Sequence, residues 1–237
     1  MAAIANDGFS RIGTLAAVIF IAIPPAAASS RLIDGVAGQS TTMKKTVIYF
    51  HSLSSPWAYM GWPRFHALIR KHDLRVLVRP TTIVTDNGGI PLRSRPDARQ
   101  RYHEVELDRW RQRLNMPLVL RPRYYPTDNQ WCARMVIAAD HLGLDALALS
   151  HALLHALWSE EKDVRDPGVR RSVAEALGFD SARLLSMEDS VEIMSAWKAS
   201  HDEAVENGVF GTPTYVYNKT LYWGQDRLDF LDEALAK

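Results

Sequence analysis

Apolar and polar positions along residues 45–82 follow a pattern that predicts a βαβ unit. KTVIYF, residues 45–50, is rich in β-branched and aromatic side chains and predicts a buried strand. From Pro56 to about Lys71 the apolar side chains recur at helical spacing, and LRVLVRPTT, residues 74–82, predicts a second strand. A helix between two such strands implies that they run parallel and are joined by a right-handed crossover.

After residue 86 the pattern becomes helical, and strand signals return only near residue 214. Five segments with helical periodicity are separated by Pro or Gly: 97–114, 129–142, 145–159, 167–177 and 187–206. TYVY, residues 214–217, and LYW, residues 221–223, predict a hairpin, and an amphipathic helix follows from about Asp226.

Removing the helical block leaves the order βαβ–ββα, which is the order of thioredoxin. We therefore predict an α/β protein: a thioredoxin-like fold with a four-stranded mixed sheet and an inserted all-helical domain. The thioredoxin-like domain is expected at residues 44–86 and 205–237, and the inserted helical domain at residues 87–204.

Residues 1–42 are expected to contribute nothing to this fold. IGTLAAVIFIAIPPAAA, residues 12–28, is apolar and uncharged and ends in small residues, which is typical of a signal peptide cleaved near Ala28. Two features favour an over-extended start instead: Asp7 offsets the charge of Arg11, and Met43 directly precedes the first strand. Both interpretations stay open. We expect a cytoplasmic protein, with export to the periplasm if residues 1–42 are a signal peptide, and a mature domain without a membrane span.

Charge and cysteine content exclude several classes of function. Lys plus Arg is 28 and Asp plus Glu is 27, so no basic field suggests a nucleic-acid partner. Cys132 is the only cysteine, which excludes an intramolecular disulfide and dithiol redox chemistry. His151 and His155 are four residues apart, but no third ligand accompanies them, and we expect no metal site.

Three local features point to one binding site. Ser55-Pro56 opens the first helix, Thr212-Pro213 precedes the third strand and is a candidate cis peptide, and Asp226 lies where the last helix begins. Taken singly, the Ser and the Asp read as helix N-caps and the Pro as an ordinary strand start. In a thioredoxin fold, however, the start of the first helix and the loop before the third strand meet in space.

Together these three places suit a short peptide that carries a thiol and a free amine. The helix start offers unpaired N–H groups, the extended backbone at Thr212 can pair with a peptide, and Asp226 would attract an ammonium group. Glutathione is such a molecule. Its thiol would supply the sulfur that Ser55 lacks, and a hydroxyl that donates to the thiolate would lower the pKa of that thiol.

The chain resembles the 2-hydroxychromene-2-carboxylate isomerase family, which is close to kappa-class glutathione transferases. The resemblance is carried by YFHSLSSPWAY (49–59), LDRWRQRLNMPLVL (107–120) and GVFGTPTYVYNKTLYWGQDRLDFLDEAL (208–235). It implies glutathione-dependent conversion of 2-hydroxychromene-2-carboxylate to trans-o-hydroxybenzylidenepyruvate, commonly by a homodimer. It also implies the site residues: Ser55 at the glutathione sulfur, the Thr212 main chain at the cysteinyl unit, Trp223, Gly224, Gln225 and Asp226 at the γ-glutamyl end, and Arg93 and Tyr124 at the aromatic acid substrate.

The sequence departs from the family at two places, and these leave the substrate open. Ser52 stands where the family often has Asp, and no Lys occurs between Lys71 and Lys162. An arginine could bind the substrate carboxylate instead: Arg79, Arg93 or Arg95. Two alternatives therefore remain: a kappa-like glutathione transferase acting on other electrophiles, and a non-catalytic peptide-binding module of thioredoxin type.

Overall fold

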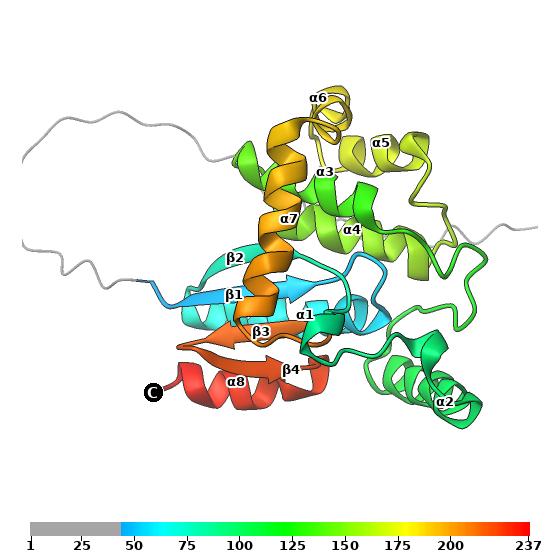
Figure 1. Cartoon of the computed structure of the whole chain (residues 1–237), viewed down its shortest axis with the longest axis vertical. Helices are drawn as coiled ribbons and strands as arrows, with labels where there is room; N and C mark the ends of the chain where they lie inside the picture. Colours follow the sequence, from blue (N-terminus) through cyan, green and yellow to red (C-terminus); the bar gives the residue numbers. More distant parts are fainter. Residues whose placement is uncertain (1–43) are drawn as a thin grey trace, which may run out of the picture. The chain divides into compact units, whose positions relative to one another are not determined.

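The computed structural model describes residues 44–237, and the expected leader at residues 1–42 lies outside them (Figure 1). The strands are β1 (Thr46–His51), β2 (Arg75–Pro80), β3 (Thr214–Tyr217) and β4 (Thr220–Trp223). The α-helices are α1 (Pro56–His72), α2 (Asp97–Arg113), α3 (Gln130–His141), α4 (Ala146–Trp158), α5 (Pro167–Ala176), α6 (Ser181–Met187), α7 (Val191–Glu206) and α8 (Leu228–Leu235). Three 3-10 helices are also present: η1 (Thr85–Asn87), η2 (Leu92–Ser94) and η3 (Gln225–Arg227).

The four strands form one mixed sheet in the order β2-β1-β3-β4. β1 pairs parallel with β2 and antiparallel with β3, which pairs antiparallel with β4. Asn218 and Lys219 make the hairpin turn between β3 and β4, and both have positive φ angles, 48° and 62°. Two-residue hairpin turns of this hand match the twist of the strands. The predicted βαβ–ββα order and the mixed sheet are thereby confirmed.

Helices cover both faces of the sheet (Figure 1). On one face, α1 and α8 pack Phe65 and Leu231 against Tyr49 and Tyr215 of the central strands. On the other face, Ala204 of α7 packs against strand residues of β1 and β3. These side chains are fully or almost fully buried. Burial of one large apolar side chain contributes about 1.5–3 kcal/mol, so both layers hold the sheet in place.

The helices α3 to α6 form a second buried cluster with the side chains of α1 that do not face the sheet. Tyr59 and Met60 of α1 belong to one buried cluster with Met135 of α3 and Leu149 of α4. The sequence did not predict α6, whose seven residues span too few turns to show a clear period, although Asp180 caps it by accepting from the Arg183 amide. The domain boundaries at residues 87 and 204 stay predictions.

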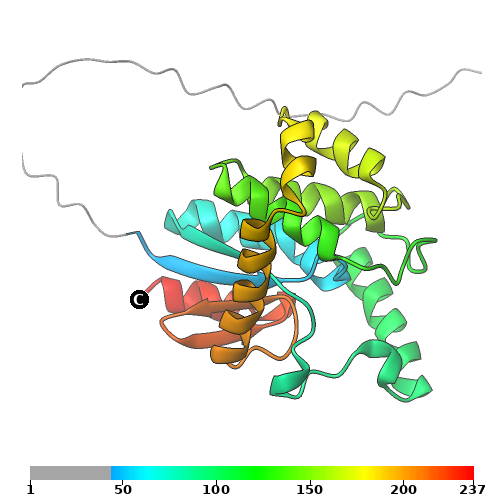
Figure 2. The same cartoon turned by 45° about the horizontal axis from the view of Figure 1, so that its top comes forward.

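Helix α2 is the least buried of the long helices. Leu107 is its only buried residue, and Figures 1 and 2 both show the helix lying away from the sheet, reached through the long connection that contains η1 and η2. A helix with one buried side chain draws little stability from packing. Most of its side chains are therefore not packed in the core, and several of them line a cavity.

Within residues 44–237, no helix combines the length and the apolar character that crossing a bilayer requires.

Candidate active site

Ser55 is both the cap of α1 and a donor toward the third strand. Its Oγ accepts a hydrogen bond from the Ala58 amide at 3.2 Å, so the N-cap interpretation is correct. The same hydroxyl donates to the Thr212 carbonyl at 3.4 Å. Pro56 occupies the first turn, where its missing N–H costs nothing. Ser55 is buried, at 8% exposure, and lies at the positive end of a 17-residue helix.

The Thr212-Pro213 peptide is cis, as the sequence predicted. The Thr212 carbonyl receives the Ser55 hydroxyl, and the Thr212 amide makes no hydrogen bond within residues 44–237. The Pro213 carbonyl accepts from the Gly224 amide at 2.8 Å, which ties the loop before β3 to the segment after β4. The loop before β3 therefore contacts both the start of α1 and the segment that leads into Asp226.

The segment 223–227 forms the third side of the site. Gly224 has a φ of 97°, and a Cβ there would lie 2.5 Å from Asp226 Oδ1, so this position requires glycine. Asp226 lies in η3 and does not cap α8; its carboxylate pairs with Arg227 at 2.6 Å. The simple N-cap interpretation of Asp226 is therefore wrong. Trp223 packs edge-on against Phe210, with ring centroids 4.7 Å apart.

Two cavities border these residues. The smaller has a volume of about 270 Å³ and the larger about 720 Å³. Both are walled by the same five residues: Trp57, Arg95, His103, Thr212 and Trp223. The shared wall means that a group held at Thr212 reaches both spaces.

Six of the eight predicted site residues line these cavities. Ser55 lines the larger, Thr212 and Trp223 line both, and Gly224, Gln225 and Asp226 line the smaller. Arg93 and Tyr124 line neither, whereas their neighbours Arg95 and Tyr125 do. Burial raises the pKa of Tyr125, and the nearby charge of Arg93 opposes that effect. A substrate role for Arg93 and Tyr124 stays a prediction.

The smaller cavity carries an excess of positive charge. Arg95, Arg99 and Arg227 line it together with Glu106 and Asp226. Glu106 pairs with Arg109 at 2.7 Å, and that hydrogen bond holds the pKa of the Glu106 carboxyl below its usual range. Because both carboxylates are paired, the unpaired guanidinium groups favour a ligand with more negative than positive charges.

The larger cavity is mostly apolar, with one polar corner. Ile83, Ile90, Leu92 and Phe210 are among its walls. The polar corner is a chain of three side chains that also lines the cavity. In it, Asn129 Nδ2 donates to Ser52 Oγ at 2.6 Å, and the Ser52 and Ser54 hydroxyls lie 2.9 Å apart.

Ser52 therefore takes part in the site, although it is not the Asp that the resemblance led us to expect. Its hydroxyl binds Asn129 and Ser54, so it helps to fix the loop that ends at Ser55. Of the three arginines considered for the substrate carboxylate, Arg95 alone lines a cavity, and Arg79 pairs with Glu203 instead.

Among the cavity residues that the sequence analysis did not single out are His103, Tyr125, Asn129 and Arg227. His103 could have been found, because Arg99, His103, Glu106 and Trp110 recur at helical spacing on α2 and so share the face that borders the smaller cavity. Tyr125 and Asn129 come from a loop without periodicity, and only the fold brings them to Ser55.

No group of three or more potential metal ligands occurs among residues 44–237. Cys132 is fully buried in α3, and its thiol donates to the Val164 carbonyl at 3.4 Å. The cavities therefore contain hydroxyls, guanidinium groups, aromatic rings and one imidazole, but not the protein's own thiol.

The family described as "DSBA-like thioredoxin domain" matches residues 46–236. The chain belongs to this family. The DSBA-like chain is 26% identical over 198 residues to the 2-hydroxychromene-2-carboxylate isomerase of Sphingobium xenophagum, a match that covers 81% of this chain and 99% of that protein. It is 26% identical over 218 residues to glutathione S-transferase kappa 2 of Caenorhabditis elegans, which covers 82% of this chain and 93% of that protein.

A solved structure of a 2-hydroxychromene-2-carboxylate isomerase is similar to this DSBA-like chain with a TM-score of 0.68 at 24% identity. The match covers 81% of this chain and 94% of that structure. The predicted fold class is confirmed, and so is the resemblance to relatives that are named as isomerases and kappa-class transferases.

Proposed function

We propose that the protein is a glutathione-dependent isomerase that converts 2-hydroxychromene-2-carboxylate to trans-o-hydroxybenzylidenepyruvate, in the breakdown of aromatic compounds. One observation carries the proposal: Ser55 and Thr212 lie in contact where a charged cavity and an apolar cavity share a wall. The names of the relatives supply the reaction. A homodimer is expected from the same resemblance and can be checked by light scattering.

The smaller cavity suits glutathione in both charge and backbone chemistry. A tripeptide needs an extended backbone partner, and Thr212 offers an amide and a carbonyl beside a cis proline. The paired Asp226 and Arg227 would hold the ammonium and the carboxylate of the γ-glutamyl end. Arg99, which lines this cavity alone, would donate to the other carboxylate.

When bound, glutathione supplies a thiolate that can add reversibly to a conjugated double bond and so allow rotation about it. Ser55 keeps that sulfur ionised. Its hydroxyl makes only a long bond to Thr212, so it can turn to donate to the sulfur. A charge-assisted hydrogen bond contributes about 1.5–3 kcal/mol and the helix end about 0.3–1 kcal/mol. At about 1.36 kcal/mol per unit, the pKa of the thiol falls by roughly one to two units.

The larger cavity would hold the aromatic acid. Its apolar walls suit a ring, and Arg95 offers a guanidinium group for the carboxylate in place of the absent lysine. Arg95 also donates to the Ile90 carbonyl, which fixes the position of its side chain. Asn129, through Ser52, keeps the loop before Ser55 in place.

The experiment is a binding measurement followed by two assays. Millimolar glutathione should raise the melting temperature of the protein, and the purified protein should then isomerise 2-hydroxychromene-2-carboxylate. If glutathione gives no shift, the enzyme proposal fails and a non-catalytic peptide-binding module gains support.

A kappa-like glutathione transferase is the second candidate. It is favoured by Ser52 and by the absence of lysine between residues 71 and 162, since both depart from the isomerase pattern. Conjugation of a chloronitrobenzene without isomerase activity would support the transferase, and the reverse result would support the isomerase.

A further inference from the structure

One histidine stands at the junction of the two cavities. His103 lies on α2 and lines both of them. All eight histidines fall within residues 44–237, and the other seven line neither cavity. The proposed reaction needs a place for the thiol proton, and Ser55 cannot take it because a hydroxyl is a very weak base.

The His103 ring is held toward the site by the start of α1. It meets the Trp57 ring edge-on, with centroids 5.3 Å apart and an interplanar angle of 81°. Trp57 follows Ser55 by two residues, and both of them line the larger cavity together with His103.

The ring nitrogens of His103 are open to a ligand. They make no hydrogen bond to any residue of the described chain, 44–237. The buried and unpartnered histidine nitrogens are those of His51 and His151, and His103 is not among them. A nitrogen that is neither bonded nor buried can accept a proton from a molecule in the cavity.

The surroundings of His103 favour its neutral form. Burial lowers its pKa, and the charge of Arg95 lowers it further. The other charged or titratable groups around the cavities come from α2, the 223–227 segment and the 125–128 loop: Arg99, Tyr102, Glu106, Asp226, Arg227, Tyr125 and Asp128. Glu106 and Asp226 are each paired with an arginine, so near neutral pH the ring is an unprotonated base beside uncompensated positive charge.

We propose that His103 is the catalytic base of the site, a role that rests on the proposed function. His103 takes the thiol proton: an N–H bond forms at the imidazole, the S–H bond breaks, and its electron pair stays on sulfur. Once glutathione is bound, the negative charge of the thiolate and of its carboxylates raises the pKa of the imidazole, so the imidazolium keeps the proton and returns it when the thiol leaves the site. Glutathione would therefore ionise without releasing a proton to the solvent.

Proton counting tests this directly. Calorimetric titration with glutathione in buffers of different ionisation enthalpy gives the number of protons released on binding. We expect almost no release at neutral pH for the wild type, although the ultraviolet absorbance reports thiolate. H103Q keeps a polar side chain of similar size but cannot take the proton, so its thiolate should form with release to the buffer, or not form at all. The isomerisation rate should fall about a hundredfold.

The matched control is H141Q, at the exposed end of α3, where His141 lines neither cavity. It should behave as the wild type. Equal proton release by wild type and H103Q, with equal thiolate absorbance, would overturn the role of His103. Absence of glutathione binding to the wild type would instead overturn the proposed function, and the assignment of His103 with it.

Discussion

At the scale of single residues, Ser55 combines a structural task with a chemical one. Its Oγ accepts from Ala58, and its hydroxyl donates to Thr212. Ser55→Ala should lose about 1 kcal/mol of stability from the missing cap and raise the pKa of the bound glutathione thiol by at least one unit. The pKa is read from thiolate absorbance as a function of pH.

Ser190 provides the matched control for this substitution. It caps α7 by accepting from the Ile193 amide, and it lines neither cavity. Ser190→Ala should cost similar stability and leave the thiol pKa unchanged. An unchanged thiol pKa in Ser55→Ala would remove Ser55 from the chemistry and leave it only as a cap.

Cys132 should be inert in the folded protein. Burial raises the pKa of its thiol to about 12, and within residues 44–237 the thiol hydrogen-bonds only to the Val164 carbonyl. A thiol-specific reagent should label it slowly in native buffer and rapidly in denaturant. Rapid labelling of the native protein would show that α3 opens far more often than its packing implies.

Sequence reasoning located the residues of this site where they are attached to element ends. Ser55 begins a helix, Thr212 precedes a strand, and Asp226 follows a hairpin, so the order of elements alone places them together. Arg93 and Tyr124 come from long connections, where no period fixes which neighbour faces a cavity. The structure places Arg95 and Tyr125 there instead.

At the scale of elements, α1 and η3 approach each other at Gly61. A Cβ at Gly61 would lie 2.9 Å from the Cβ of Gln225, which is itself buried in the segment that borders the smaller cavity. Gly61→Ala favours the helix by roughly 0.5–1 kcal/mol but must displace Gln225. We expect weaker glutathione binding, measured by calorimetry, without a comparable loss of stability.

The control for Gly61→Ala is a substitution to alanine at an exposed position of the same helix, away from the cavities. Arg70→Ala changes an exposed position near the end of the helix and should leave glutathione affinity unchanged. If Gly61→Ala binds as tightly as Arg70→Ala, the contact between α1 and η3 does not set the geometry of the cavity.

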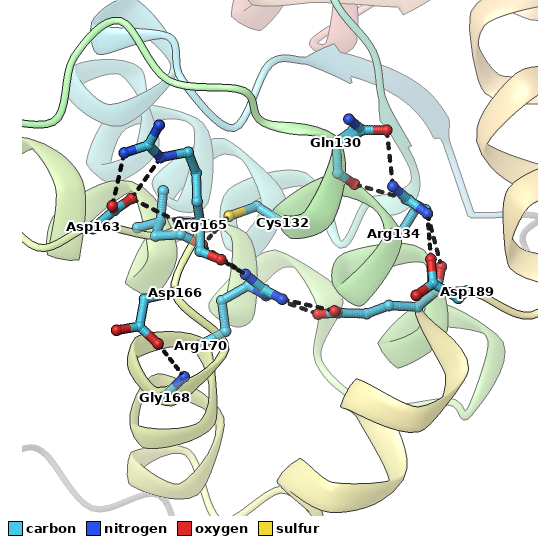
Figure 3. A network of polar contacts seen from close by, with 11 residues as sticks. Gln130, Cys132, Arg134, Asp163, Arg165, Asp166, Gly168, Arg170 and Asp189 are labelled. Carbon is cyan, nitrogen blue, oxygen red and sulfur yellow. Dashed lines mark hydrogen bonds and ion pairs between the residues drawn. The ribbon is translucent and has the colours of Figure 1, made fainter.

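The helices α5 and α6 depend on a buried ion pair in the part of the fold that Figure 3 shows. Arg170 makes two bonds of 2.8 Å to Glu188, both side chains are almost completely buried, and Arg170 also donates to the Val164 carbonyl. Burial raises the pKa of Glu188, and Arg170 opposes this. Arg170→Met leaves the carboxylate unpaired and should cost about 3–5 kcal/mol in urea unfolding.

The double variant Arg170→Met with Glu188→Leu tests the cause of that loss. It removes the unpaired charge, so it should recover a large part of the stability. A double variant as unstable as Arg170→Met would mean that packing or the Val164 contact, and not the isolated charge, accounts for the loss.

Elements with a strong period were predicted well, and short ones were not. The strands and five of the six helices between β2 and β3 agree with the pattern to within a few residues. α6 and the 3-10 helices are too short for a period to appear, and α7 begins at Val191 rather than residue 187 because Ser190 caps it.

At the scale of the whole described unit, one fully buried and one half-buried histidine make stability depend on pH. Burial lowers the pKa of His51 and that of His151 to about 4 each. His51 is completely buried against Tyr49, and His151 stacks on Tyr59 and Trp62. Because the unfolded chain binds these protons more readily, stability is complete above about pH 6.5 and is lost as the pH falls toward 4.

For His51 alone the loss is roughly 3 kcal/mol, since the pKa is lowered by more than two units. Unfolding in urea at a series of pH values measures it. His151→Phe keeps an aromatic ring in the stack but cannot titrate, so its stability should fall less steeply with acid than that of the wild type. An identical slope would show that His151 does not contribute.

The only thiol of the chain lies sealed in a helix, far in sequence from the hydroxyls that begin α1. An oxidant that enters the cleft therefore meets no sulfur fixed to the polypeptide. Under the proposed function it could oxidise only the thiol of bound glutathione, which then dissociates and is replaced by reduced glutathione from solution. The site would regain its activity by exchange alone, with no reductase acting on the protein.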